Sequence, residues 1–138
     1  NQICYGSGHR IMLQAVHHIA IIAGDYPRSK NFYTNVLGLK IIREVYREER
    51  NSYKLDLSLN GQYIIELFSF PDALARPSRP EARGLRHLAF SVTDIAAAID
   101  QLFKKGVVCE PVRIDPYTGK KFSFFADPDG LPLELYES

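Results

Sequence analysis

The sequence has little net charge and few cysteines. Its 17 Lys and Arg nearly balance its 16 Asp and Glu, which leaves a net charge of +1, and only two of its 138 residues are cysteine. A chain of this length buries about two thirds of its unfolded surface, so it needs no disulfide to fold. Scattered, balanced charges lack the basic stripe of nucleic-acid-binding or anionic-membrane-binding proteins. These scarcities favour a small globular domain with neither kind of partner.

Long apolar runs are also missing, since no stretch approaches the roughly 20 residues that span a bilayer. The only methionine, Met12, stands directly before the first strand-like run, and residues 1–11 do not continue the pattern that follows. We therefore predict that the native chain starts at Met12 and that residues 1–11 derive from an expression vector. Cys109 is then the single thiol. With no secretory signal, it predicts a cytoplasmic protein and a buried, unreactive cysteine.

One short pattern occurs twice in the chain. The stretches HHIAIIAGD and RHLAFSVTD each contain a His, an Ala two positions later and an Asp seven positions later. The same offset along the chain separates the members of each pair, which are His18 and His87, Ala20 and Ala89, and Asp25 and Asp94. We infer that the two halves are copies of one structural unit.

The first half, residues 13–70, predicts the element order β-α-β-β-β. Short β-branched or alternating runs indicate strands, and Asn-Gly at 60–61 is a strong hairpin signal. Apolar residues at helical spacing before Gly38 indicate one helix. The predicted strands are 15–22, 40–48, 52–59 and 62–70, and the predicted helix is 29–38.

The second half, residues 85–138, predicts the same order again. A helix over 94–106 begins at an Asp cap and ends at Gly106. The predicted strands are 85–92, 107–114, 120–127 and 131–137. Residues 71–84 contain three prolines and several arginines, which indicates a linker loop. The predicted fold class is α+β, with two tandem βαβββ modules.

Each module has a His in its first strand and a Glu in its last: His18 with Glu66, and His87 with Glu134. Strand side chains alternate between faces, and the bulkier apolar set should pack under the helix, so both histidines should point away from it. Both glutamates sit in apolar strands, where an ionised carboxylate costs several kcal/mol unless a partner offsets it. Two imidazoles and two carboxylates suit a divalent metal ion. The alternative is that the glutamates pair with arginines.

Two other residue types near these positions receive structural roles. His17 neighbours His18, but strand alternation predicts that it lies on the opposite face and is not a ligand. Asp25 and Asp94 precede the predicted helices and should cap them.

The residues resemble the vicinal oxygen chelate superfamily, which includes glyoxalase I, bleomycin-resistance proteins and extradiol dioxygenases. The stretches HHIAIIAGDYPRSKNFYTNVLGLK and FFADPDGLPLELYE resemble its entry and exit motifs, and the resemblance covers nearly all of residues 13–137. More narrowly, ARPSRPEARGLRHLAF and RIDPYTGKKFSFF resemble segments of the small bacterial YaeR-like glyoxalase-family proteins. The resemblance implies an open, cup-shaped mixed sheet around a metal site.

The resemblance also implies a ligand set and a reaction. Glyoxalase I binds one metal ion through a His and a Glu from each module, and His18, Glu66, His87 and Glu134 fill these positions. The implied activity is a lyase or isomerase reaction on an α-oxoaldehyde thiol adduct through a metal-stabilised enediolate. Glu134 is the expected base and Glu66 the quasi-symmetric second choice. Ni²⁺ or Zn²⁺ is expected, with Co²⁺, Mn²⁺ and Fe²⁺ as alternatives.

Two departures limit the resemblance to glutathione-dependent glyoxalase I. Ile22 and Phe70 stand where bacterial enzymes have an Arg and an Asn that hold glutathione, so the thiol is left open. Candidate cations for another substrate are Arg43, Arg47, Lys54, Arg113, Lys120 and Lys121. The alternatives are a non-catalytic sequestration protein of the bleomycin-resistance type and another superfamily reaction such as epimerisation.

The expected assembly is a homodimer with a small-molecule substrate, as the family implies. The modules pair either within one chain or by exchange between two chains. The sequence leaves both arrangements open.

Overall fold

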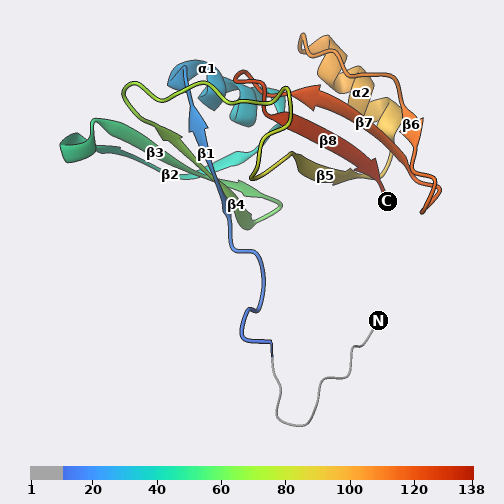
Figure 1. Cartoon of the computed structure of the whole chain (residues 1–138), viewed down its shortest axis with the longest axis horizontal. Coiled ribbons are helices and arrows are strands. Elements are labelled where there is room, and N and C mark those ends of the chain that lie inside the picture. Colours follow the sequence, from blue (N-terminus) through green and yellow to red (C-terminus); the bar gives the residue numbers. More distant parts are fainter. Residues whose placement is uncertain (1–10) are drawn as a thin grey trace.

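The computed structural model describes residues 11–138 and contains two four-stranded sheets. Figure 1 shows the sheets side by side, with the helices along one side of the molecule. Each sheet comes from one half of the chain, and both have the same strand connection. This confirms the predicted α+β class with two tandem βαβββ modules. The prediction for residues 1–11 falls, except for Ile11, outside the described range.

The first sheet has the strand order β1-β4-β3-β2, with β1 parallel to β4 and the other pairs antiparallel. Its elements are β1 (Ile19–Ala23), α1 (Tyr26–Asn31), a π-helical turn η1 (Phe32–Val36), β2 (Lys40–Arg47), a 3₁₀ turn η2 (Glu48–Arg50), β3 (Ser52–Leu59) and β4 (Gln62–Ser69). Asn60 and Gly61 both have positive φ, 50° and 82°, as the predicted hairpin requires.

The second sheet repeats this arrangement in the order β5-β8-β7-β6, with β5 parallel to β8. Its elements are β5 (Leu88–Val92), α2 (Ile95–Lys104), β6 (Arg113–Ile114), β7 (Lys121–Ala126) and β8 (Pro132–Glu137). The predicted strand 107–114 is wrong in length, because only Arg113–Ile114 pairs regularly with β7. Glu110 N donates to Phe124 O at 2.8 Å, but Pro111 follows and has no N–H to continue the hydrogen bonds between the strands.

The starts of several elements also differ from prediction. β1 begins at Ile19 rather than 15, and β5 begins at Leu88 rather than 85, because their pairing with β4 and β8 begins there. Residues 11–16 instead extend away from the body in Figure 1, and Val16 is 82% exposed. Helix α1 begins earlier than predicted, because Asp25 accepts a hydrogen bond from Arg28 N. Asp94 caps α2 in the same way, as predicted.

The core lies between the helices and one face of each sheet. Ile65 and Leu67 of β4 are fully buried, as is Leu133 of β8, and all three belong to one continuous apolar cluster. Alternation therefore turns Glu66 and Glu134 to the opposite faces of their sheets. Within residues 11–138, no helix is both long and apolar enough to cross a bilayer.

Polar contacts join the two modules, one of them buried. The Tyr33 hydroxyl, from η1, donates to Asp127 Oδ2 in the turn before β8, at 2.7 Å. Gly24 N, at the end of β1, donates to both carboxylate oxygens of Asp129 at 3.1 and 3.2 Å. A Cβ at Gly24 would lie 2.7 Å from Asp129 Oδ1, so a larger residue here would require the Asp129 carboxylate to move. The modules thus have a defined relative position.

Candidate metal centre

The two His–Glu pairs occupy the same register in their modules. Glu66 lies opposite Ala20 across the β1–β4 pair, and Glu134 lies opposite Ala89 across the β5–β8 pair. Each His precedes its Ala by two positions, so its ring reaches the Glu on the neighbouring strand. His18 Nε2 lies 3.4 Å from Glu66 Oε1, and His87 Nε2 lies 3.0 Å from Glu134 Oε1.

These distances and donor types fit a divalent metal ion. Two donors each about 2.1 Å from one ion, at angles of about 90–110°, lie about 3.0–3.4 Å apart. Both observed separations fall in this range. Glu134 is only 9% exposed, and a carboxylate so enclosed needs a partner. The His–Glu pairs are therefore suitable as halves of a metal site.

The structure does not gather the four side chains in one place. Among residues 11–138, no group of three or more His, Cys, Asp or Glu side chains is positioned to hold a metal ion. Each pair stands alone on its own sheet. A four-ligand site therefore needs the two modules to meet in a different way from the one within this single chain.

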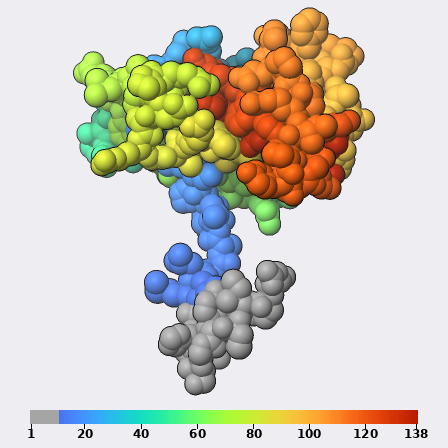
Figure 2. Space-filling model, turned by 45° about the vertical axis from the view of Figure 1, so that its right-hand side comes forward, coloured from blue at the N-terminus to red at the C-terminus, as the bar shows by residue number. Residues whose placement is uncertain are grey.

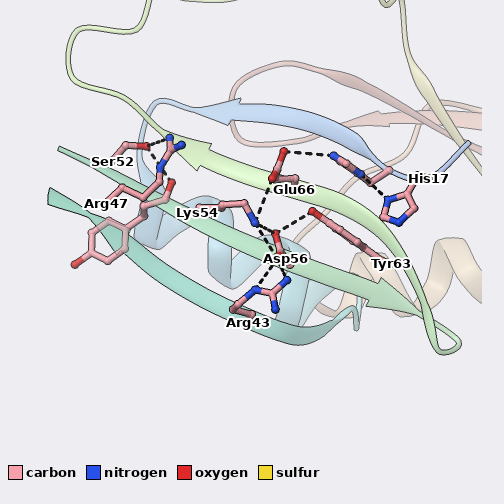
Figure 3. Close-up of polar contacts among 10 residues, drawn as sticks. His17, Arg43, Arg47, Ser52, Lys54, Asp56, Tyr63 and Glu66 are labelled. Atoms are coloured by element: carbon pink, nitrogen blue, oxygen red, sulfur yellow. Dashed lines mark hydrogen bonds and ion pairs between the residues drawn. The ribbon is translucent and has the colours of Figure 1, made fainter. Parts of the chain in front are cut away.

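A charged network surrounds the first pair, as Figure 3 shows. Lys54 Nζ lies 3.2 Å from Glu66 Oε2 and 2.7 Å from Asp56 Oδ1. Asp56 is fully buried and also accepts hydrogen bonds from Arg43 at 2.9 Å and from the Tyr63 hydroxyl at 2.9 Å. Burial alone would raise the pKa of Asp56, but the hydrogen bonds from Lys54, Tyr63 and Arg43 outweigh it and lower the pKa. Asp56 is thus held as an anion.

The same network orients the first histidine. The rings of His18 and Tyr63 stack with their centroids 4.7 Å apart, and the Tyr63 hydroxyl is fixed on Asp56. The prediction that His17 lies on the face opposite His18 is wrong. His17 Nδ1 lies 2.8 Å from His18 Nδ1, and its ring packs edge-on against Tyr63. Both histidines precede β1, so strand alternation does not apply to them.

The second pair has apolar neighbours instead. Phe124 lies opposite Glu134 on β7, where Asp56 lies opposite Glu66 in the first module. The Phe124 ring packs edge-on against His87, with centroids 5.1 Å apart. Within the described residues, His87 is the only ion-pair partner of Glu134, whereas Glu66 also has Lys54. The two glutamates are therefore equivalent in position and different in environment.

A cavity of about 710 Å³ opens beside His87. Its wall comes partly from the segment between the modules, which Figure 2 shows in yellow against the orange second module. Its charged lining residues are Arg76, Arg79, Glu81, Arg86, Glu110 and Arg113. Of these, only Arg113 was among the predicted cationic candidates. The other arginines were missed because their segment was interpreted as a linker, and only the RPSRPEARGLR charge density could have drawn attention to it.

Among the other predicted cations, Arg43 and Lys54 belong to the Asp56 network. Arg47 donates to Ser52 Oγ, and its guanidinium lies 4.8 Å from the Phe68 ring centroid. Lys120 and Lys121 are exposed and do not line the cavity beside His87.

Comparisons with known proteins agree with this architecture. The chain is 66% identical over 125 residues to the uncharacterized protein YaeR of Escherichia coli, covering 91% of this chain and 97% of that one. It is 62% identical over 127 residues to the uncharacterized protein YwkD of Bacillus subtilis, covering 92% and 99%. The crystal structure of a glyoxalase family protein from Enterococcus faecalis superposes with a TM-score of 0.86 at 50% identity, covering 92% and 100%.

More distant relatives have named activities. A lactoylglutathione lyase of Salmonella typhimurium is 33% identical over 131 residues, covering 88% of this chain and 90% of the enzyme. A 2-epi-5-epi-valiolone epimerase of an Actinomyces species is 30% identical over 142 residues, covering 88% and 78%. The sequence profile of the Glyoxalase/Bleomycin resistance protein/Dioxygenase superfamily matches residues 15–135. With this profile, these relatives and two modules of the same topology, the chain belongs to the Glyoxalase/Bleomycin resistance protein/Dioxygenase superfamily.

Proposed function

We propose that the protein is a metal-dependent, glyoxalase-I-like lyase or isomerase that acts on an α-oxoaldehyde thiol adduct or a similar vicinal-oxygen substrate. The observation that carries this proposal is the matched register of two His–Glu pairs at metal-ligand spacing. The similarity to lactoylglutathione lyases supports the reaction class. His18, Glu66, His87 and Glu134 would hold one divalent ion, with Ni²⁺ or Zn²⁺ expected and Co²⁺, Mn²⁺ and Fe²⁺ as alternatives.

The proposal includes a homodimer in which modules are shared. Within one chain the two pairs lie apart, so His18 and Glu66 of one protomer would face His87 and Glu134 of a second copy. Apolar residues on β2, among them Ile41 and Val45, are exposed in the single chain, which supports association. A cytoplasmic location is part of the proposal and is supported by the free thiol of Cys109.

A divalent ion held by His18, Glu66, His87 and Glu134 would supply Lewis-acid stabilisation of the negative charge that develops on the substrate oxygens. Glu134 would take the proton from the carbon that carries the hydroxyl group and the sulfur of the added thiol, and return it to the neighbouring carbon. This division of roles is supported by Lys54, which holds one oxygen of Glu66, whereas no Lys or Arg among residues 11–138 pairs with Glu134. Tyr63 would keep His18 in its ligand orientation.

Metal content per chain, measured by elemental mass spectrometry on protein purified without an affinity tag, tests the site first. We expect about one divalent ion per chain, and its loss in His18→Ala and His87→Ala. Metal-loaded protein should then convert a methylglyoxal–thiol adduct to the thioester. Glu134→Gln should abolish turnover, whereas Glu66→Gln should chiefly weaken metal binding. Absence of metal uptake by the parent protein contradicts the proposal.

Epimerisation is a second candidate, because Ile22 and Phe70 are apolar and an epimerase is among the relatives. It predicts solvent-deuterium exchange into a 2-oxo substrate with no thiol present. Sequestration of a small molecule predicts instead ligand binding that survives metal removal.

A further inference from the structure

The cavity beside His87 has walls that are fixed by hydrogen bonds. Arg76 donates through Nη2 to the backbone oxygens of Leu85 and Arg86 at 2.8 and 3.0 Å, and through Nε to Ser78 Oγ at 2.8 Å. Ser78 Oγ in turn donates to Gly130 O at 3.0 Å, in the turn before β8. The hydrogen bonds of Arg76 and Ser78 thus hold residues 76–86 against the second module. The segment is a defined wall and not a loose connection.

The remaining charges of the cavity are unevenly matched. Arg79 and Arg86 share one carboxylate, Glu81, at 3.5 and 3.3 Å. Arg113 lies 3.7 Å from Glu110, a long separation for an ion pair. All of these side chains are more than half exposed, so their mutual pairing is weak and their donors stay accessible. Counting Arg76, four guanidinium groups face two carboxylates in the lining. The cavity therefore has excess positive charge.

Arg113 connects this charge to the His–Glu pair. Its guanidinium lies 4.9 Å from the ring centroid of Phe122 and 5.8 Å from that of Phe124. Phe124 also contacts His87, which itself lines the cavity. Stacking on aromatic rings orients a guanidinium while leaving its N–H donors free for an anion. A molecule held at His87 and Glu134 would therefore reach Arg113 with an extension into the cavity.

We propose that this cavity binds an anionic group, a phosphate or a carboxylate, through Arg86 and Arg113, and that the natural substrate carries such a group next to its vicinal oxygens. The forked N–H donors of arginine match the paired oxygens of both groups. The choice of substrate rests on the proposed function, whereas anion binding by the cavity does not. The inference also agrees with apolar Ile22 and Phe70, since a small anionic substrate needs no tripeptide grip in the first module.

The test uses metal-free protein, so that no ion other than the arginines attracts the probe. Uniformly ¹⁵N-labelled protein is titrated separately with inorganic phosphate and with malonate at constant ionic strength, and amide shifts are followed by NMR. We expect saturable shifts at cavity residues such as Ala126 and Gly130. The tighter of the two probes identifies the anionic group as phosphate or carboxylate.

Matched variants assign the binding. Arg86→Gln with Arg113→Gln should weaken the tighter probe by about tenfold or more. Arg28→Gln, at an exposed position of helix α1 that does not line the cavity, should leave the affinity unchanged. Shifts that do not saturate for either probe, or that persist equally in the double variant, overturn the inference. Because no metal or turnover enters this test, its failure is distinct from failure of the proposed activity.

Discussion

At the scale of single residues, the first module differs from the second chiefly by Asp56. Its side chain is 1% exposed and accepts hydrogen bonds from Lys54, Arg43 and Tyr63. Asp56 fixes Tyr63, whose ring stacks on His18, and it fixes Lys54, which forms an ion pair with Glu66. In the second module Phe124 occupies the matching register position, so a carboxylate lies opposite Glu66 and an aromatic ring lies opposite Glu134. A buried anion with three donors should contribute strongly to stability.

We expect Asp56→Asn to lower the free energy of unfolding by about 2–4 kcal/mol, because it removes the buried charge to which Lys54, Arg43 and Tyr63 donate. Urea unfolding followed by circular dichroism measures this. Asp100→Asn is the control, since Asp100 forms an exposed pair with Lys104 and should change stability by less than about 0.5 kcal/mol. Equal effects of the two variants would mean that the network does not stabilise the fold.

At the scale of elements, a carboxylate joins helix α1 to strand β2. Lys30 Nζ donates to both oxygens of Glu44 at 2.8 and 3.0 Å, and the Tyr26 hydroxyl donates to the same group. The hydrogen bond from Lys30 and then that from Tyr26 lower the pKa of Glu44 below its ordinary value of 4.5. The folded state therefore binds this proton less readily than the unfolded state. The stabilisation is present above about pH 4.5 and is lost as the pH falls below it.

Glu44→Gln should consequently destabilise the protein at pH 7 and have a smaller effect at pH 3. Urea unfolding at pH 7, 5, 4 and 3 gives the comparison, with the difference between parent and variant shrinking through the last steps. Lys30→Met, which removes the first donor, should reproduce part of this pattern. A difference that stays constant with pH would show that Glu44 does not contribute through its charge.

At the scale of the whole molecule, contacts between the two modules fix their relative position within the chain. A second copy would bind to this fixed arrangement. Tyr33 is fully buried, and its hydroxyl is the donor to Asp127 Oδ2, whose other oxygen accepts from the backbone of Asp129 and Leu131. Tyr33→Phe would leave Asp127 with a buried oxygen that lacks this donor. The expected loss of unfolding free energy is about 1–3 kcal/mol. Exposed Tyr117→Phe is the control, and a similar loss there would contradict this account.

The proposed sharing of each metal site between two chains makes a prediction about mixed dimers. If each site takes one pair from each chain, a dimer of His18→Ala with His87→Ala contains one intact four-ligand site and one site that lacks both histidines. Co-expression with two tags and purification through both should therefore recover about half of the parent metal content per dimer. A mixed dimer of His18→Ala with Glu66→Ala should recover none. Equal metal content in both mixed dimers would contradict shared sites.

Much of the fold follows from local pattern. Alternation along β4 and β8 predicts which face holds Glu66 and Glu134, and the caps and Asn-Gly turn predict where α2 and the β3–β4 hairpin begin. Boundaries failed where pairing with a neighbour decides them. Pro111 shortened β6, and the absence of partner strands before Ile19 left His17 free of strand alternation. Such effects depend on a second segment, which a periodic pattern does not contain.

The sequence by itself determined the repeat, the module order and the approach of each His to the Glu of its own module, because the His–Glu separation is nearly the same in the two copies, 48 and 47 residues. Metal binding by these residues stays a prediction. Only the tertiary structure decided that the two His–Glu pairs stand apart within one chain. It also decided that Lys54, held by Asp56, pairs with Glu66 and not with Glu134, and that arginines of residues 76–86 line the same cavity as His87. The physical reason is that these relations join segments distant in the chain, whose contacts depend on how the two modules pack.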